Sequence, residues 1–168
     1  QPLKAGDIVV IRAHGVPRQM QESLEKQHVR IVDATCPKVK KAQILIQRQA
    51  EQNKQLLLFG ERDHPEVRGL VSDASVYTIF ENLEELQAKK LHPGGSYFLA
   101  AQTTQDRESF NAIRDYLTAH ISPDMTVLDT ICMATKDRQE EVRALSNQVE
   151  AIVVAGGKDS GNTRRLAQ

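Results

Sequence analysis

Residues 31–36 read IVDATC, and residues 127–132 read VLDTIC. In both stretches an apolar, β-branched run leads into an aspartate, and a cysteine follows three positions later. When the chain is shifted by 96 positions, the agreement continues beyond the cysteines without a gap. The matched pairs are Asp33 with Asp129, Cys36 with Cys132, Lys40 with Lys136, Gln43 with Gln139, Gln52 with Gln148, Gly60 with Gly156, Asp63 with Asp159, Arg68 with Arg164 and Leu70 with Leu166. The sequence therefore contains a repeated unit of strand, cysteine, helix, strand and polar loop.

Apolar runs alternate with longer amphipathic stretches along the whole chain, which is typical of βα units and a largely parallel sheet. We expect strands at residues 7–13, 29–33, 55–60, 76–80, 96–101, 125–129 and 151–156. We expect helices at residues 18–26, 39–53, 82–90, 106–119 and 135–148, with short ones after Pro65 and near Asn162. The predicted fold class is α/β, built from repeated parallel-sheet βα units.

The repeat also predicts how the chain divides. Residues 37–124 form a complete central α/β unit, residues 1–36 are the second half of a first unit, and residues 125–168 are the first half of a third. Gln1 opens directly into a strand, and the last predicted helix stops about one turn after it starts, before it can bury a face. We therefore expect a piece of a longer protein.

The composition excludes several classes of partner. Lysine plus arginine and aspartate plus glutamate both total 22, so no basic field attracts nucleic acid or acidic membranes without sequence preference. No apolar run reaches the ~20 residues of a membrane helix, and the polar start does not look like a secretory signal. We expect a cytoplasmic protein with a small-molecule partner, no nucleic acid and no membrane.

The chemically distinctive stretches all follow predicted strands. They are AHG at 13–15, ATCP at 34–37, RDHPEV at 62–67, QTT at 102–104, TIC at 130–132 and KDSGN at 158–162. In open parallel sheets the ligand crevice lies outside the carboxyl ends of the strands. We therefore expect these six loops to meet at one site.

The two cysteines have more than one interpretation. Cys36 and Cys132 each precede a helix, whose N-terminus favours the thiolate form that binds metal. Two symmetric thiolates suggest a soft metal or an iron-sulfur cluster, although two cannot complete the usual three or four ligands, so a third unit should supply another. A buried apolar role for each cysteine, or a reversible disulfide between them, is the alternative.

The polar residues of the loops suit an anionic ligand. His14 and His64 can bind phosphate, while Ser160, Asn162 and nearby backbone N–H groups resemble an anion cradle. Turn, capping and solvated roles are the ordinary alternatives for each of these residues.

Two further loop residues suit proton transfer. Glu66, two residues after His64 and preceded by Pro65, is a candidate proton donor on condition that burial in the fold raises its pKa toward neutrality. A glutamate that only stabilises the first turn of a helix is the alternative. Thr103 and Thr104 offer hydroxyls to a substrate, or cap the following helix.

Taken together, the motifs resemble one family. AHGV (13–16), DATCP (33–37), HPEV (64–67), QTT (102–104), IC-x-AT-x-x-RQ-x-x-V (131–142) and S-x-NT-x-RL (160–166) occur in its order and span nearly the whole chain. The sequence resembles the 4-hydroxy-3-methylbut-2-enyl diphosphate reductases, the IspH or LytB family of the methylerythritol phosphate pathway of isoprenoid biosynthesis.

The resemblance implies a fold and a reaction. Three α/β units with pseudo-threefold symmetry would surround a central cavity, and each would contribute a cysteine to a 4Fe-4S cluster, the first cysteine lying outside this chain. The implied enzyme is an oxidoreductase that removes the hydroxyl of an allylic diphosphate and yields isopentenyl and dimethylallyl diphosphate. Electrons would come from an external donor such as ferredoxin or flavodoxin. We expect the isolated 168 residues to show little or no turnover.

The resemblance also implies residue roles. Cys36 and Cys132 would be metal ligands, and Glu66, supported by Thr103, would deliver the proton. The implied substrate-binding residues are His14, His64, Thr103, Ser160 and Asn162.

Three positions depart from the family pattern. Gly161 stands where serine is usual, Gln43 where histidine is common, and Asp63 where glycine often occurs. None of them removes a residue with an expected catalytic role, but Asp63 adds negative charge near an anionic substrate. A non-redox diphosphate-binding α/β module or a divergent paralogue is therefore the alternative function, and a thiol-redox protein is a third.

Overall fold

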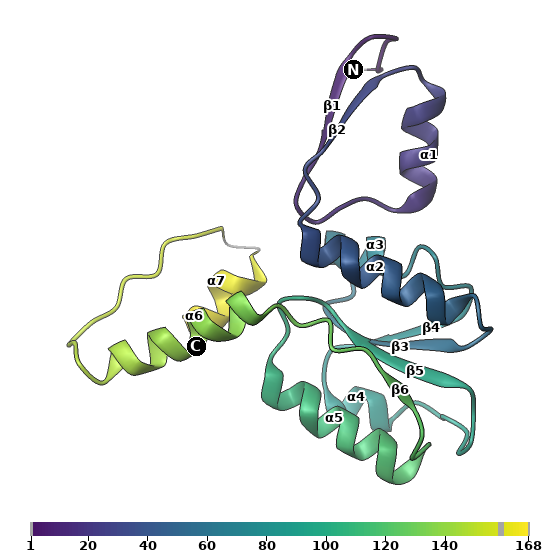
Figure 1. The fold of residues 1–168 in the computed structure, drawn as a ribbon. Helices are drawn as coiled ribbons and strands as arrows, with labels where there is room; N and C mark the ends of the chain where they lie inside the picture. The colour runs from purple at the N-terminus through teal and green to yellow at the C-terminus, as the bar shows by residue number, and fades with distance from the viewer. Residues whose placement is uncertain (1, 158–159, 168) are drawn as a thin grey trace.

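The computed structural model describes residues 2–157 and 160–167, and at positions 135, 136, 161, 162 and 165 only the backbone. Three lobes follow one another along the chain (Figure 1). The N-terminal lobe holds β1, α1 and β2, the central lobe holds α2 to β6, and α6 and α7 project as a C-terminal lobe. Most of the buried side chains belong to the central lobe.

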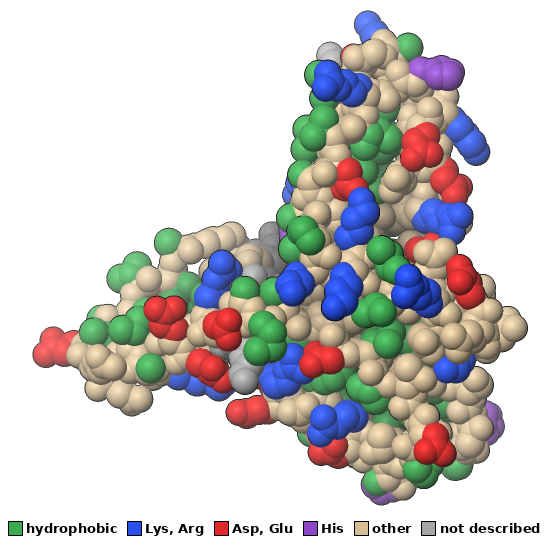
Figure 2. Space-filling view, viewed as in Figure 1, with side chains coloured by type: hydrophobic (Ala, Val, Ile, Leu, Met, Phe, Trp, Pro, Cys, Tyr) green, Lys and Arg blue, Asp and Glu red, His purple; other side chains and the backbone are tan. Residues whose placement is uncertain are grey.

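The N-terminal lobe is a parallel strand pair covered by one helix. It consists of β1 (Ile8–Ile11), α1 (Arg18–Lys26) and β2 (Arg30–Asp33). The two strands pair from Ile8 opposite Arg30 to Ile11 opposite Asp33. Ile8 and Val10 are 63% and 60% exposed, and Figure 2 shows apolar side chains along the outer edge of this lobe. The lobe therefore buries little apolar surface by itself.

The central lobe is a four-stranded parallel sheet in the order β4-β3-β5-β6. Its strands are β3 (Gln55–Phe59), β4 (Tyr77–Phe80), β5 (Tyr97–Ala101) and β6 (Thr126–Val127). One face carries α2 (Pro37–Ala50) and α3 (Pro65–Leu70), and the other carries α4 (Leu83–Gln87) and α5 (Arg107–His120) (Figure 1). The predicted α/β class with parallel sheets is confirmed.

Strand β3 supplies both halves of the core. Leu56 and Leu58 pack toward α2 and α3, while Leu57 and Phe59 pack toward α4 and α5. Side chains alternate between the two faces of a strand, so a strand covered on both sides must be apolar throughout. This explains why residues 55–59 read as one continuous apolar run after Gln55.

The C-terminal lobe differs from the prediction at one element. It contains α6 (Met133–Ser146) and α7 (Gly161–Leu166), but residues 151–156 do not form the expected strand. A strand needs a neighbour that takes its backbone hydrogen bonds, and the described residues place none beside this segment. Val153 is accordingly 92% exposed. The local pattern favours a strand, but no pairing completes it here.

Residues 125–129 are expected to form the strand that opens the third unit. This segment contains β6, which pairs with β5 and is therefore the last strand of the central sheet. We keep the division into units 1–36, 37–124 and 125–168 as a proposal about the repeat. Within the described part of the chain, no helix is both long and apolar enough to cross a membrane.

The turn between β2 and α2 is held by a charged aspartate. Asp33 accepts a hydrogen bond from the backbone N–H of Thr35 at 2.9 Å and forms an ion pair with Lys40 of α2. The Lys40 ammonium, helped by the hydrogen bonds from Thr35, lowers the pKa of Asp33 from 3.8 to about 2. The first Asp-x-x-Cys motif is therefore closed by its own aspartate.

Replacing this aspartate tests its charge. Because the pKa of Asp33 is lower in the folded protein than its ordinary value, the charge stabilises the fold above about pH 4 and ceases to do so as the pH falls toward 2. We expect Asp33→Asn to lower the free energy of unfolding at pH 7 by about 1 kcal/mol or less, since the ion pair is partly exposed. Urea unfolding at several pH values measures this. Asp63→Asn, at a carboxylate that is 98% exposed, is the control. A deficit that persists unchanged at pH 2 contradicts the charge explanation.

Candidate functional site

The carboxyl ends of β3 and β5 bring a glutamate and a threonine into contact. One carboxylate oxygen of Glu66 accepts a hydrogen bond from the backbone N–H of Thr103 at 2.6 Å, and the other accepts from the Thr103 hydroxyl at 3.0 Å. Glu66 is 1% exposed and Thr103 is 5% exposed. A buried carboxyl with both oxygens oriented by hydrogen bonds is well placed for proton transfer.

The local sequence explains how Glu66 is presented. Pro65 occupies the first position of α3, where its missing N–H costs nothing. His64 caps the helix, because its Nδ1 accepts a hydrogen bond from the backbone N–H of Glu66 at 3.1 Å. His64, Pro65 and Glu66 therefore act as one rigid segment after β3.

A second histidine reaches this segment from the N-terminal lobe. His14 follows β1, and its ring meets the ring of His64 edge to face, with centroids 5.1 Å apart. Its Nδ1 is buried and has no hydrogen-bond partner among the described residues. Buried polar atoms are rarely left unpaired in folded proteins, so this nitrogen indicates a place for a polar ligand.

The backbone N–H of each cysteine is hydrogen-bonded to one of the loops that carry these residues. The N–H of Cys36 donates to the carbonyl of Ala13 at 2.9 Å, and the N–H of Cys132 donates to the carbonyl of Thr103 at 2.8 Å. Both thiols are free and half-buried, and neither caps the helix that it precedes. The helices α2 and α6 thus begin with a thiol available for another bond.

These contacts form one continuous chain through the site. Cys36 is hydrogen-bonded to the loop that carries His14, and the His14 ring contacts the ring of His64. His64 is hydrogen-bonded to the backbone of Glu66, and the Glu66 side chain is hydrogen-bonded to Thr103. The carbonyl of Thr103 in turn accepts a hydrogen bond from Cys132. Five of the six loops expected to meet are therefore joined by direct contacts.

The donor set is consistent with part of an iron-sulfur ligand set. Two free thiols from two repeat units stand at the starts of 14-residue helices, whose N-termini favour negative charge. No group of three His, Cys, Asp or Glu side chains suited to one metal ion occurs in the part of the chain that the structure describes. Cys36 and Cys132 are two of the predicted ligands, and a complete set would need a donor from elsewhere.

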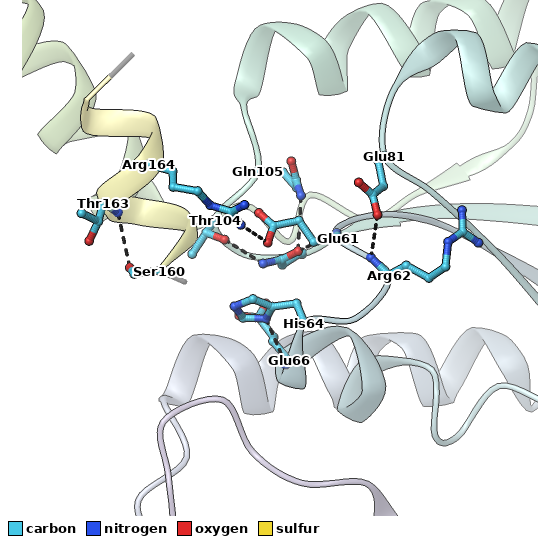
Figure 3. Close-up of polar contacts among 11 residues, drawn as sticks. Glu61, Arg62, His64, Glu66, Glu81, Thr104, Gln105, Ser160, Thr163 and Arg164 are labelled. Atoms are coloured by element: carbon cyan, nitrogen blue, oxygen red, sulfur yellow. Dashed lines mark hydrogen bonds and ion pairs between the residues drawn. The ribbon is translucent and has the colours of Figure 1, made fainter. Parts of the chain in front are cut away.

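The sixth loop approaches through α7 (Figure 3). Ser160 caps this helix, since its hydroxyl oxygen accepts from the N–H of Thr163 at 3.3 Å. Arg164 on the same helix forms an ion pair with Glu61, which follows β3. The side chain of Asn162 lies outside the described residues, so its predicted role has no structural counterpart here.

Gln102 is a site residue whose importance the sequence did not indicate. It is fully buried; its Oε1 accepts from the N–H of Glu61 at 2.9 Å, and its Nε2 donates to the hydroxyl of Thr104 at 3.0 Å. Gly60 permits this close approach, because an added Cβ would lie 3.1 Å from the Gln102 Cβ. Gln102 is the first residue of the QTT motif, but the sequence predicts possible roles only for the two threonines of that motif.

Two departures from the family pattern have simple structural roles. The Asp63 carboxylate is 98% exposed and lies 3.9 Å from Arg68, so it is directed to solvent and partly compensated. The amide of Gln43 fills the space beside Gly15 and Gly69, where a Cβ would come within 3.2 and 3.0 Å of its Nε2. Gln43 therefore packs at the junction of the N-terminal and central lobes.

Known proteins are similar to this chain in sequence and in fold. Residues 1–168 match the family described as LytB protein. A 4-hydroxy-3-methylbut-2-enyl diphosphate reductase of Solidesulfovibrio magneticus is 56% identical over 164 residues, which cover 97% of this chain and 57% of that protein. One from Nitratidesulfovibrio vulgaris is 53% identical over 166 residues, covering 98% and 57%. The chain thus spans a little over half the length of these relatives.

Two solved structures are also similar. The E-1-hydroxy-2-methyl-but-2-enyl-4-diphosphate reductase from Plasmodium falciparum superposes with a TM-score of 0.88 at 28% identity, covering 98% of this chain and 52% of that one. A structure of (E)-4-hydroxy-3-methyl-but-2-enyl diphosphate reductase gives 0.73 at 35% identity, covering 99% and 59%. With the match over its full length, the chain belongs to the LytB family.

Proposed function

We propose that this chain is part of an oxidoreductase that converts 4-hydroxy-3-methylbut-2-enyl diphosphate into isopentenyl and dimethylallyl diphosphate. The observation that carries the proposal is the continuous set of contacts from Cys36 through His14, His64, Glu66 and Thr103 to Cys132. It combines two thiols, a buried carboxyl group and a histidine nitrogen without a partner among the described residues. Relatives that are more than half identical bear the name of this reductase.

Cys36 and Cys132 would hold a 4Fe-4S cluster together with a cysteine outside this chain, and such a cluster would supply electron transfer and Lewis acidity. The overall reaction consumes two electrons and two protons; the carbon-oxygen bond breaks, the hydroxyl leaves as water and a carbon-hydrogen bond forms. An external donor such as ferredoxin or flavodoxin would deliver the electrons. The cytoplasmic location stays a prediction.

Glu66 is the proposed proton donor. Thr103 holds both of its oxygens, so the carboxyl cannot rotate away from the site. Glu66 is 1% exposed, so bulk water has little access to the carboxyl group. Thr103 would therefore act by orienting the acid, and its hydroxyl would also contact the substrate.

The diphosphate would be held by the two histidines and by α7. The buried, unpaired Nδ1 of His14 can bind a phosphate oxygen, and His64 lies against the same ring. Ser160, with Asn162, would contribute from the C-terminal lobe. Fixing the anionic end positions the carbon-oxygen bond for reduction.

Replacing either cysteine tests the redox centre. In the full-length protein, reconstituted without oxygen, we expect Cys36→Ser or Cys132→Ser to lower bound iron and visible absorbance and to reduce turnover by at least ~100-fold, because a cluster ligand is lost. Iron analysis and absorbance measure the cluster independently of activity. Two results together would instead support the non-redox binding module. The wild-type protein would bind no iron, and inorganic pyrophosphate would stabilise both cysteine variants against unfolding.

Replacing the acid tests proton delivery. We expect Glu66→Gln to lower kcat by about 100-fold or more with a smaller change in KM, since general acids contribute ~10² to 10⁴ in rate. Thr103→Val should have a smaller effect, because the backbone N–H still orients one oxygen. Initial rates with a chemical reductant measure both, and Glu84→Gln, at an exposed glutamate of α4, is the control. Full activity of Glu66→Gln would exclude Glu66 as the donor.

A further inference from the structure

We propose that Glu61 and Arg164 are positioning residues, whose ion pair sets the place of α7, and with it Ser160, against the loop after β3. The proposal rests on the function proposed above and extends it to two residues that have no assigned part in the chemical step. The pair spans 103 positions of sequence and joins α7 to the loop after β3 (Figure 3). It therefore connects the C-terminal lobe with the central lobe at the edge of the site.

Glu61 is a firmly held end of this connection. Its backbone N–H donates to Oε1 of Gln102 at 2.9 Å, and Gln102 is fully buried. The Gln102 side chain also donates, through Nε2, to the hydroxyl of Thr104, which is next to Thr103 in the chain. Glu61 is thus anchored to the strand end that orients Glu66.

Arg164 is coupled directly to the residue that it positions. The backbone N–H of Arg164 donates to the carbonyl of Ser160 at 3.0 Å. The backbone N–H of Thr163, the residue before Arg164, donates to the Ser160 hydroxyl. Any displacement of Arg164 relative to Glu61 therefore carries Ser160 with it. Residues 147–157, which lead into α7, form no helix or strand, so α7 is otherwise held by its packing against α6.

The ion pair has the strength expected of a reversible contact. The side chains of Arg164 and Glu61 are 53% and 24% exposed, so water and salt reach both charges. An exposed pair of this kind shifts an equilibrium by up to about five-fold. That is enough to favour the docked position of α7.

The first test uses steady-state kinetics of the full-length protein. Glu61→Gln and Arg164→Gln should each raise KM by about two- to five-fold and change kcat by less than about two-fold, because the contact affects how α7 meets the bound diphosphate rather than the chemical step. The exchanged pair Glu61→Arg with Arg164→Glu should recover most of the loss. The ratio of mutant to wild-type KM should approach one in high salt, since screening removes the pair from both proteins.

Glu85→Gln is the matched control. Glu85 forms a comparable ion pair with Arg62 at 3.1 Å, but both residues belong to the central lobe. It should leave KM and its salt dependence unchanged. Equal effects of Glu85→Gln and Glu61→Gln, no recovery in the exchanged pair, or a KM ratio that ignores salt would each overturn the positioning role.

A second measurement separates this proposal from the proposed reaction. Amide hydrogen exchange of residues 161–167 in the full-length protein should become up to about five-fold faster in Glu61→Gln and Arg164→Gln and return in the exchanged pair, while α5 stays unchanged. If the wild-type protein turns over but these amides are unaffected, the positioning role is wrong and the reaction stands. If the amides respond but the wild-type protein reduces no substrate, the reaction is wrong and the docking role stands.

Discussion

The parallel pairing of β3 with β5 is the constraint on which the rest of the structure depends. Both strands are buried on their two faces, so their register is set by apolar packing on each side. Parallel neighbours end at the same edge of a sheet, and the loops after them must therefore meet there. The contact between Glu66 and Thr103 is the direct result. A slip of one residue would turn the apolar side chains of Leu56 and Leu57 to the wrong faces and separate the acid from its hydrogen-bond donors.

Polar groups at this edge are satisfied by one another, with one notable exception. Glu66 accepts two hydrogen bonds, and Gln102 both donates and accepts, so neither carries the cost of an unpaired buried group. The Nδ1 of His14 remains without a partner among the described residues. In the proposed function, an anion that hydrogen-bonds to this nitrogen would remove the cost of leaving it unpaired. Preorganised donors of this kind need little rearrangement during a reaction.

The three lobes contribute unequally to stability and to the site. The central lobe holds nearly all of the core, whereas the N-terminal strands and α7 bury little apolar surface. The outer lobes nevertheless supply His14, Cys36 and Ser160. Their attachment relies on polar contacts such as the ion pair of Arg164 with Glu61, which are weaker and more sensitive to salt than apolar packing. The buried apolar core is therefore concentrated in the central lobe, while the flanking lobes supply polar residues at its edge.

The sequence by itself determined the local elements and the kind of chemistry. Periodicity located α1, turn and capping residues located α3, and the repeated Asp-x-x-Cys placed Cys36 and Cys132 at equivalent strand ends, because these signals depend only on neighbouring residues. Tertiary structure alone decided which strands are adjacent and which distant side chains meet. It left residues 151–156 without a strand partner, made Gln102 the buried link between two loops, and joined Glu61 to Arg164. Such pairings depend on residues far apart in the chain, and no local pattern encodes the identity of a distant partner.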